Sequence, residues 1–307
     1  MIDMFNTPSD KVSAQVFYFA GAGAWQMWQK PTNATFVYMF VIGGGSGGGG
    51  GRTSAILGAT GGGGGASSST THAVYAANMI PDTLYLQVGA GGAGGVNQGT
   101  GVAGSLSYVS FDPDTTAINI LLQSGAAGAT GGIGSGSSST GATGGTGGTS
   151  WGFATAINGN IGLVDSNPGQ NGTAGTGSGA SPQNLTFTTI LSGGAGGGAV
   201  SGGGTTYNGG SILASSITPL LSPGVMNAAD STAIGSHGVT NLFGNTQSPM
   251  FFTGGAGGAA TSTTARKAGA GGNGAYGCGG GGGGGAFNAT GGDGGKGGDG
   301  LIMIVCV

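Results

Sequence analysis

Three glycines in the first third of the chain have the spacing of a dinucleotide-binding motif. Gly89, Gly91 and Gly94 follow an alternating apolar segment, as in the G-x-G-x-x-G fingerprint that binds a pyrophosphate. The chain has 80 glycines among 307 residues. Roughly five chance matches to this motif are therefore expected in a chain of this composition. Residues 96–104, which follow, contain too many glycines for the helix that the motif requires, so we expect no nucleotide cofactor.

One segment has the pattern of a calcium site. Gly294–Ile302, with the sequence GGKGGDGLI, matches one copy of the calcium-binding nonapeptide G-G-x-G-x-D-x-U-x. Such sites need several stacked repeats, so we interpret Asp299 first as the residue that turns the chain into the next strand. Whether this single copy binds calcium stays open. Asp112-Pro113-Asp114 is interpreted in the same way, as a turn between strands.

Other groups that carry catalysis or bind metals are few. The chain contains nine acidic residues, all of them Asp and scattered, which suggests no paired-carboxylate acid/base site. His72 and His237 stand among Thr, Ser and Gly without the spacing of zinc ligands, and both are expected in loops. No G-K-[ST] sequence is present, so a phosphate-binding P-loop is not expected. We predict no catalytic residues, no metal site, no cofactor and no enzymatic activity.

The two cysteines, Cys278 and Cys306, are too few for a disulfide framework. Cys306 lies in an apolar terminal segment, where a thiol packs as a small apolar side chain. Both thiols are predicted to be reduced.

Short apolar segments bounded by Gly, Pro, Asn or Asp predict β-strands. They comprise residues 16–19, 35–42, 84–88, 106–111, 118–122 and 301–307. Residues 35–42 and 301–307 are almost continuously apolar, which predicts strands buried on both faces. We expect 301–307 to pair with earlier strands, so that the two ends of the chain meet. Trp25, Trp28 and Tyr38 could form a sugar-stacking platform, but beside these strands they are favoured as core residues.

Glycine tracts connect the expected strands, at residues 43–51, 61–65, 89–95, 193–199, 277–285 and 291–300. Flexible linkers are one interpretation of such tracts. The alternative is polyproline II conformation, a thin helix with three residues per turn whose backbone groups must find partners outside it. Because glycine has no side chain, several such helices can pack side by side and bond laterally. We expect the tracts at 43–51, 61–65, 89–95 and 277–285 to be ordered and mutually hydrogen-bonded.

The composition excludes several classes of protein. Six basic residues and a net charge of −3 leave no basic patch for nucleic acid. The apolar runs are shorter than the roughly 20 residues that cross a bilayer, so no membrane insertion is expected. The opening MIDMFNTPSDKV lacks the pattern of a secretion signal. The glycine content disfavours helices, and the absence of a strict Gly-X-Y repeat excludes collagen.

The middle of the chain, residues 126–250, is rich in Ser, Thr, Asn and Gly. We treat residues 1–307 as a single glycine-rich β domain, in which 1–125 and 251–307 form the sandwich and the glycine framework. Residues 126–250 are expected to be exposed loops. Gly-Ser bridges could then replace them without unfolding the base that 1–125 and 251–307 form. Aromatic side chains dominate binding hot spots, so Trp151, Tyr207 and Phe243 in these loops are candidate receptor contacts.

Four segments follow one another along the chain: the W-x-x-W-x-K-P turn at Trp25–Pro31, the strand at 35–42 that runs into Gly43–Gly45, the LxLxVGxGG segment at Leu84–Gly92, and the closing GGDGLI at Gly297–Ile302. In these segments the chain resembles the glycine-rich domains of tailed-phage fibre and other virion-surface proteins. The same order of segments is similar to the glycine-rich domain of the anaplastic lymphoma kinase receptor. These likenesses imply an all-β fold: an antiparallel, tumour-necrosis-factor-like jelly-roll sandwich with packed polyglycine II helices.

This resemblance implies a structural protein of the phage surface, as a spike, fibre or decoration subunit assembled in the host cytoplasm. The alternative is a receptor-binding adhesin that recognises host glycan or an outer-membrane protein. An extracellular filament is a third interpretation. The expected partners are other virion proteins and further copies of the chain itself, with a homotrimer as the leading expectation.

Overall fold

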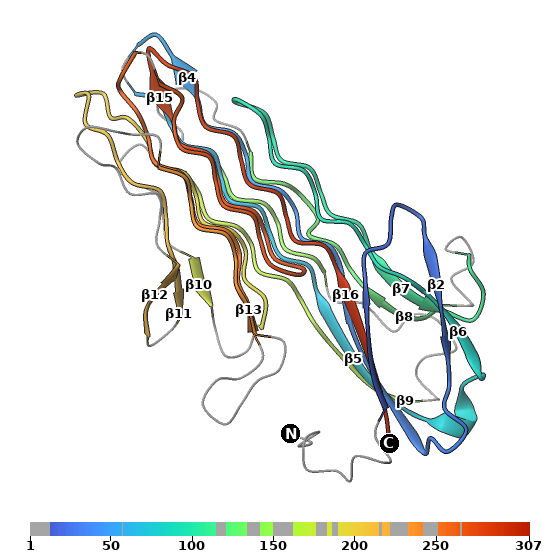
Figure 1. Cartoon of the computed structure of the whole chain (residues 1–307). Helices are drawn as coiled ribbons and strands as arrows, with labels where there is room; N and C mark the ends of the chain where they lie inside the picture. Colours follow the sequence, from blue (N-terminus) through green and yellow to red (C-terminus); the bar gives the residue numbers. More distant parts are fainter. Residues whose placement is uncertain are drawn as a thin grey trace.

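The computed structural model describes residues 13–56, 58–114, 121–133, 142–149, 162–175, 183–185, 190–214, 217–221, 233–241, 251–264 and 266–307. Two β-sheets lie at one end of an elongated molecule, and a bundle of extended segments continues from them to the opposite end (Figure 1). The one helical element among these residues is a short 3-10 turn at Ala77–Met79. None of the described residues belongs to a helix with the length and hydropathy needed to cross a membrane.

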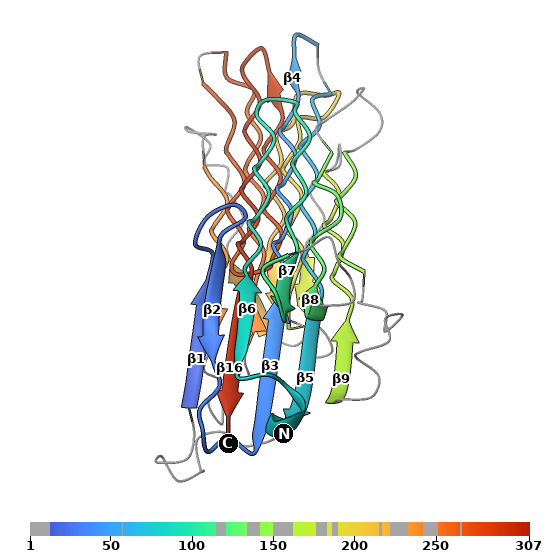
Figure 2. The ribbon, with the colours of Figure 1, turned by 90° about the vertical axis from the view of Figure 1, so that its right-hand side faces the viewer.

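Both main sheets are antiparallel throughout (Figure 2). The five-stranded sheet has the order β1 (Ser13–Tyr18), β16 (Leu301–Cys306), β3 (Phe36–Ile42), β5 (Thr70–Ala76), β9 (Gly162–Asn167). The four-stranded sheet has the order β2 (Trp25–Gln29), β6 (Thr83–Gln87), β7 (Ser107–Ser110), β8 (Leu121–Gly125). The expected antiparallel β-sandwich is therefore confirmed, with strands close to the predicted segments; residues 118–120 lie outside the described residues.

Seven shorter strands lie within the bundle or at its ends: β4 (Thr53–Ser54), β10 (Gln183–Leu185), β11 (Ile212–Ala214), β12 (Ile217–Leu221), β13 (Thr240–Asn241), β14 (Phe251–Phe252) and β15 (Ala286–Phe287). β4 and β15 pair in parallel near the end of the bundle farthest from the sheets (Figure 1). This pairing matters for the site described below, because it joins two turns that are far apart in sequence.

The core of the sandwich lies between the two sheets. It includes Trp28, Val37, Val41, Leu84, Leu86, Val109, Ile302 and Ile304, all at most 3 % exposed. The opposite face of the five-stranded sheet is buried as well, where Phe40, Ile42, Leu301 and Met303 pack with Leu191, Phe252 and Cys278. The prediction that 35–42 and 301–307 form strands buried on both faces is confirmed by β3, from Val37 onward, and by β16.

β16 also confirms that the two ends of the chain meet. It lies between β1 and β3, with Phe17 opposite Ile302 on one side and Val41 opposite Ile302 on the other. All six residues of β16 are buried. Such a strand cannot stay in water without exposing apolar side chains on both faces, which is why the last segment closes the sheet.

The glycine tracts form a hydrogen-bonded lattice of extended segments, which we call rods. In the rod at 43–52, successive N–H groups donate to three different neighbours: Gly44 to Ser105 at 2.8 Å, Gly45 to Gly298 at 2.9 Å and Ser46 to Ala66 at 2.9 Å. The next three residues repeat the cycle, donating to Val102, Gly295 and Gly63. A direction that recurs every third residue is the geometry of polyproline II, so the expected polyglycine II packing is confirmed.

The carbonyl groups of the same rod bond to three further neighbours. Gly44, Gly45 and Ser46 accept from the N–H groups of Gly128, Gly92 and Gly280. The rod thus has six neighbours, and the rods at 60–68 and 277–286 are likewise each bonded to six. These three inner rods replace a hydrophobic core in this half of the molecule, because their backbone polar groups are satisfied by one another.

Glycine is required in the inner rods because neighbouring backbones are too close for a side chain. A Cβ added at Gly48 would lie 2.0 Å from the carbonyl oxygen of Gly281. Ser46, which interrupts the tract, is an informative exception. Its hydroxyl accepts from the N–H of Ala66 and donates to the carbonyl of Thr130, each at 2.7 Å. These side-chain hydrogen bonds take the place of backbone hydrogen bonds beside the rod at 126–133, which is irregular at this point.

The outer rods show the same period in their sequences. In the rod at 291–300 every third residue carries a side chain, namely Asp293, Lys296 and Asp299, and all the others are glycine. The three side chains are at least partly exposed, whereas most of the glycines between them are buried. The period of three therefore places the side chains along the exposed side of the rod and leaves glycine at the positions that pack against neighbouring rods.

The structure corrects the expectation that residues 126–250 are exposed loops. The described parts of this segment include rods at 126–133, 142–149 and 168–175, and the rod at 191–200 is wholly buried. These rods are needed because the inner rod at 60–68 takes its lateral partners from them. The other described residues of 126–250 belong to strands β9 to β13 or to turns and short segments beside them. Residues 134–141, 150–161, 176–182, 186–189, 215–216, 222–232 and 242–250 lie outside the described ones.

Candidate functional site

The end of the bundle opposite the sheets is made of the turns that join neighbouring rods, and we call it the tip (Figure 1). It contains the turns at 52–60, 95–99, 201–206, 262–267 and 287–291. The inner rods consist mainly of glycine and small residues, whereas the turns at this end carry larger and more varied side chains. Recognition commonly depends on such loops held by a rigid scaffold.

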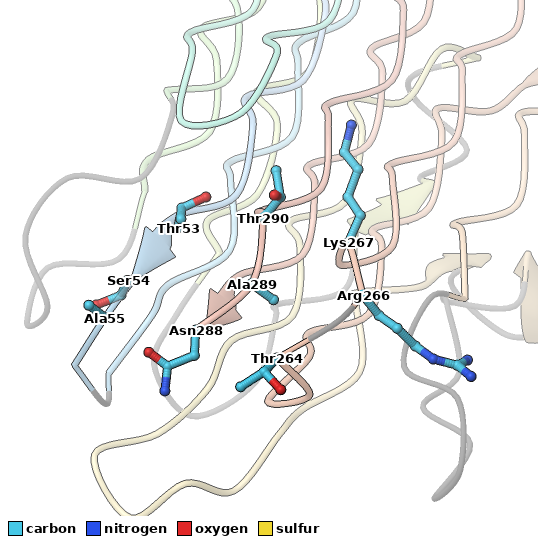
Figure 3. Close-up of a pocket in the computed structure, with 9 residues that line it drawn as sticks. All are labelled: Thr53, Ser54, Ala55, Thr264, Arg266, Lys267, Asn288, Ala289 and Thr290. Carbon is cyan, nitrogen blue, oxygen red and sulfur yellow. The ribbon is translucent and has the colours of Figure 1, made fainter.

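Three of these turns surround a hollow of about 440 Å³ (Figure 3). It is lined by Thr53, Ser54, Ala55, Thr264, Arg266, Lys267, Asn288, Ala289 and Thr290. The lining thus combines hydroxyl groups, one amide, two cations and two alanines. It includes no aromatic side chain and no aliphatic one larger than alanine.

Hydrogen bonds between the turns hold this lining in place. Asn288 donates its N–H to the carbonyl of Ser54 at 2.7 Å, beside the parallel pair of β4 and β15. The Thr53 hydroxyl accepts from the N–H of Gly291 at 2.9 Å and donates to Oδ1 of Asn97 at 2.7 Å. Three separate stretches of chain, at 53–54, 97 and 288–291, are therefore bonded to one another beside the hollow.

Backbone strain is concentrated at the same end. Among the described residues, three non-glycine residues have positive φ: Asn97 at 30°, Gln98 at 59° and Asn288 at 52°. All three lie in turns at the tip. Asn tolerates this region better than most residues, whereas Gln98 has no such preference. Strained residues that persist are typical of sites that a structure holds for a purpose.

Among the described residues, the tip carries more basic side chains than acidic ones. Arg52, Arg266 and Lys267 lie there, half of the six basic residues in the chain. Lys267 forms an ion pair with Asp293, the one acidic residue among those described at this end. In Figure 3 the side chains of Arg266 and Lys267 extend in different directions from one side of the hollow. Both residues belong to the lining of the hollow, and the guanidinium of Arg266 points away from the other labelled side chains (Figure 3).

Of the three residues expected to contact a receptor, Tyr207 lies among the described residues. Tyr207 follows the turn at 201–206, where it is half-buried and donates its N–H to the carbonyl of Ala199 at 2.9 Å. Trp151 and Phe243 lie outside the described residues. The sequence analysis also missed the residues of the hollow. Their one signal was the interruption of glycine tracts by Arg and Lys beside Thr, as in Thr264–Lys267.

The glycines that match the G-x-G-x-x-G motif pack against neighbouring rods. Gly91 of the G-x-G-x-x-G match donates its N–H to Oδ1 of Asp299 at 2.8 Å, and an added Cβ at Gly91 would lie 2.0 Å from the carbonyl oxygen of Gly297. Asp299 also accepts from Nζ of Lys296 at 2.9 Å. The carboxylate of the calcium-like nonapeptide thus joins two rods, and no metal-binding cluster occurs among the residues described.

His72 is not in a loop, and this expectation is wrong. It lies in β5, where its Nδ1 and the hydroxyl of Tyr38 share a 2.8 Å hydrogen bond, with its ring 4.6 Å from that of Phe40. Burial lowers the pKa of His72, and the nearby Asp165 carboxylate opposes the shift. Burial raises the pKa of Tyr38 to about 12, so its hydroxyl keeps its proton near neutral pH.

His237 does lie outside helices and strands, in the segment 233–239. Its Nδ1 accepts the N–H of Asn273 at 2.9 Å, so it satisfies the backbone of an outer rod.

The proposed aromatic platform is not formed by its three residues. Trp28 is 1 % exposed between the sheets, whereas Tyr38 packs on the opposite face of the five-stranded sheet. Trp25 points to the outer face of the four-stranded sheet, opposite Gln87. The core interpretation is confirmed for Trp28.

Both cysteines are free and buried. Cys306 faces the sandwich core, and Cys278 lies in the cluster on the other face of the five-stranded sheet. A sheet between the two thiols prevents them from forming a disulfide. Burial raises the pKa of Cys278 to about 12, which suppresses its thiolate and its reactivity.

An antiparallel sandwich whose strands continue into a polyglycine II lattice defines a class of glycine-rich β proteins. The family model described as "Glycine-rich domain" matches residues 20–306, and the chain belongs to this family. No curated protein sequence matches it significantly.

Proposed function

We propose that this chain is a non-enzymatic structural protein of a phage particle, exposed on its surface as a spike, fibre or decoration subunit. The observation that carries the proposal is the lattice of glycine rods, which holds the tip at a fixed distance from the two sheets. β1 and β16 lie at the end of the molecule that contains the sheets (Figure 1). In the proposed arrangement this end faces the particle and the tip points away from it. The likeness to virion-surface glycine-rich domains and to their jelly-roll sandwich supports the same role.

A receptor-binding adhesin at a tail or fibre tip is the second candidate function. It is favoured by the polar hollow at the tip and by the strained turns around it. In this role the protein recognises a host surface glycan or outer-membrane protein. Tyr207 lies at the same end and remains a candidate contact, together with Trp151 and Phe243.

The partners we propose are further copies of the chain, as a homotrimer, and other virion proteins, without nucleic acid or membrane insertion. Charged residues make up 5 % of the chain, so little repulsion opposes self-association. The proposed location is the virion surface after assembly in the host cytoplasm, with an extracellular filament as the alternative. Light scattering of the purified protein measures the oligomeric state, and a mass of one chain at all concentrations contradicts the trimer.

Copy number in purified particles tests the function. Quantitative mass spectrometry of particles purified from cells that produce this chain during infection is expected to find hundreds of copies for a decoration protein and a few per particle for a tip adhesin. Labelling an epitope inserted between Gly202 and Gly203, in the open turn at the tip, is expected to decorate the particle exterior. Particles that lack the chain, or that leave the epitope inaccessible, contradict the proposal.

A further inference from the structure

We propose that the hollow at the tip binds an anionic sugar, one that carries a carboxylate or a phosphate, from a bacterial surface glycan. The inference rests on the proposed adhesin role and names its ligand. Four observations carry it: the size of the hollow, the chemistry of its lining, the charge around it and the bonding that holds it.

The hollow has the dimensions of a small-ligand site. Its volume of about 440 Å³ falls within the roughly 300–1,000 Å³ of typical ligand pockets. It is formed between three turns rather than along one of them, so a bound ligand contacts residues 53–55, the three residues Thr264, Arg266 and Lys267, and residues 288–290 together. This suits a mono- or disaccharide unit that several side chains surround.

The lining favours a glycan over a protein loop. Thr53, Ser54, Thr264 and Thr290 supply hydroxyl groups, and Asn288 supplies an amide. These groups both donate and accept hydrogen bonds, as sugar hydroxyls do. Protein hot spots instead depend on aromatic and large apolar anchors. Ile56 and Val96, which are exposed at this end, do not line the hollow.

The charge around the hollow selects an anion. The chain as a whole has a net charge of −3, yet the described tip carries Arg52, Arg266 and Lys267 against the single carboxylate of Asp293. Three other described acids, Asp82, Asp112 and Asp114, lie in turns at the sheet end. An anionic ligand is therefore attracted to the tip, and guanidinium and ammonium groups form strong hydrogen bonds to carboxylate and phosphate.

The turns are fixed by bonds between them, so little order has to be imposed on binding. β4 pairs with β15, and Thr53 joins Gly291 and Asn97. A preorganised site loses less conformational entropy when a ligand binds.

Two lysines of the chain offer a matched comparison. Lys267 at the tip and Lys296 in the middle of an outer rod each pair with an Asp, and their side chains are 47 % and 49 % exposed. The test variant is Arg266→Gln with Lys267→Gln, and the control is Lys296→Gln. The control removes one of the same charges and breaks the same kind of surface pair, away from the hollow.

The probes are polymer-displayed glucuronate, glucose 6-phosphate and neutral glucose, bound to a biosensor and titrated with the full-length protein. We expect at least one acidic probe to bind about tenfold more tightly than glucose, and the double variant to lose about tenfold on it. The control Lys296→Gln is expected to bind as the wild type does. The acidic probe that binds identifies carboxylate or phosphate as the recognised group. Equal binding of glucose, or an equal loss in the control, overturns the proposal.

A second variant separates loss of binding from loss of folding. Thr264→Val keeps the volume of the side chain and removes a hydroxyl, so it is expected to weaken the acidic probe without changing the melting temperature. Adsorption of phage carrying the same variants separates the ligand from the role. If the double variant adsorbs normally while phage lacking the chain does not, the anionic ligand is wrong and the attachment role stands. If phage lacking the chain adsorbs normally, the adhesin role itself fails.

Discussion

At Gly282, in the inner rod 277–286, an added Cβ would lie 2.0 Å from the carbonyl oxygen of Gly62. The atom it meets is backbone, which cannot rotate away as a side chain can. The rods must then separate and stretch the hydrogen bonds on which this half of the molecule depends. At Gly202, in the open turn at the tip, an added Cβ meets nothing within 4 Å.

This contrast gives a prediction about two methyl groups. Gly282→Ala is expected to lower the free energy of unfolding by about 3 kcal/mol, the upper range for overpacking a core. Gly202→Ala is expected to change it by less than about 0.5 kcal/mol, as at other open surface positions. Urea unfolding followed by circular dichroism measures both. Equal effects at the two positions would mean that the rods are loosely packed.

His72 predicts how stability depends on pH. Its pKa in the folded protein is lowered from the ordinary value of 6.5 by burial. Between the two pKa values the unfolded chain binds the proton more readily than the folded protein does. The contribution of His72 to stability is therefore fully present above about pH 6.5 and is lost as the pH falls toward the folded pKa. The slope for one proton is at most about 1.4 kcal/mol per pH unit.

The measurement compares unfolding at pH 7.5 and pH 5 in the wild type, His72→Asn and His237→Asn. His72→Asn is expected to lose less stability between the two pH values than the wild type does, because the titrating group is gone. His237→Asn serves as the control and should keep the wild-type dependence. An unchanged slope in His72→Asn would show that burial in β5 does not hold the ring neutral.

At the scale of the elements, all six residues of β16 are buried. Ile304 is completely buried in the sandwich core, whereas Val307, just beyond the strand, is 43 % exposed. Ile304→Ala is expected to reduce the free energy of unfolding by about 3 kcal/mol, through lost burial and the cavity that remains. Val307→Ala should reduce it by well under 1 kcal/mol. Thermal unfolding of the two variants compares them, and similar melting temperatures would argue against a two-sided burial of β16.

The same elements show what could be predicted from sequence. Residues 35–42 and 301–307 were assigned correctly because continuous apolar runs have few alternatives to a strand buried on both faces. The glycine tracts were assigned because the chain has too few apolar residues for an ordinary core. The rods within 126–250 were missed, since Ala, Ser and Thr at every third position resemble loop composition unless the period of three is noticed. His72 was misplaced for a related reason, as its Thr and Ala neighbours carry a weak strand signal.

The candidate site could not be predicted from the sequence by the same means. Thr53, Thr264 and Asn288 are separated by more than 200 positions at the extremes and have no shared spacing. They meet because the rods at 43–52, 253–261 and 277–286 run in the same direction and end together at the tip. Their proximity is a property of the lattice, and only the order in which the rods pack reveals it.

The molecule as a whole combines two kinds of core. The sandwich is stabilised by burial of apolar side chains, and the bundle by backbone hydrogen bonds among segments that lose much entropy on ordering. Glycine segments gain nothing from side-chain burial, so an isolated rod has no interaction that would keep it extended. The rods are therefore expected to form together, with the strands that continue into them fixing their first positions.

This interdependence reverses the expectation that Gly-Ser bridges can replace 126–250 and leave the base folded. Gly63 donates its N–H to Ile133, Gly64 donates to Thr173, and the carbonyl of Gly62 accepts from Gly197. Deleting 126–250 removes each of these partners from one inner rod. A buried backbone group left unpaired costs about 1–3 kcal/mol, so several of them exceed the roughly 5–15 kcal/mol by which a typical domain is stable.

We therefore predict that the variant in which Gly-Ser bridges replace 126–250 unfolds without a cooperative transition, or accumulates as insoluble protein. The matched control replaces only the turn at 201–205 with five Gly and Ser residues, which leaves every rod in place and should preserve the wild-type melting transition. Calorimetry of both variants, with amide exchange across 60–68, measures the difference. Slow exchange at Gly62, Gly63 and Gly64 in the bridged variant would contradict the argument, because it would mean that the rod stays ordered without the partners that now satisfy its backbone.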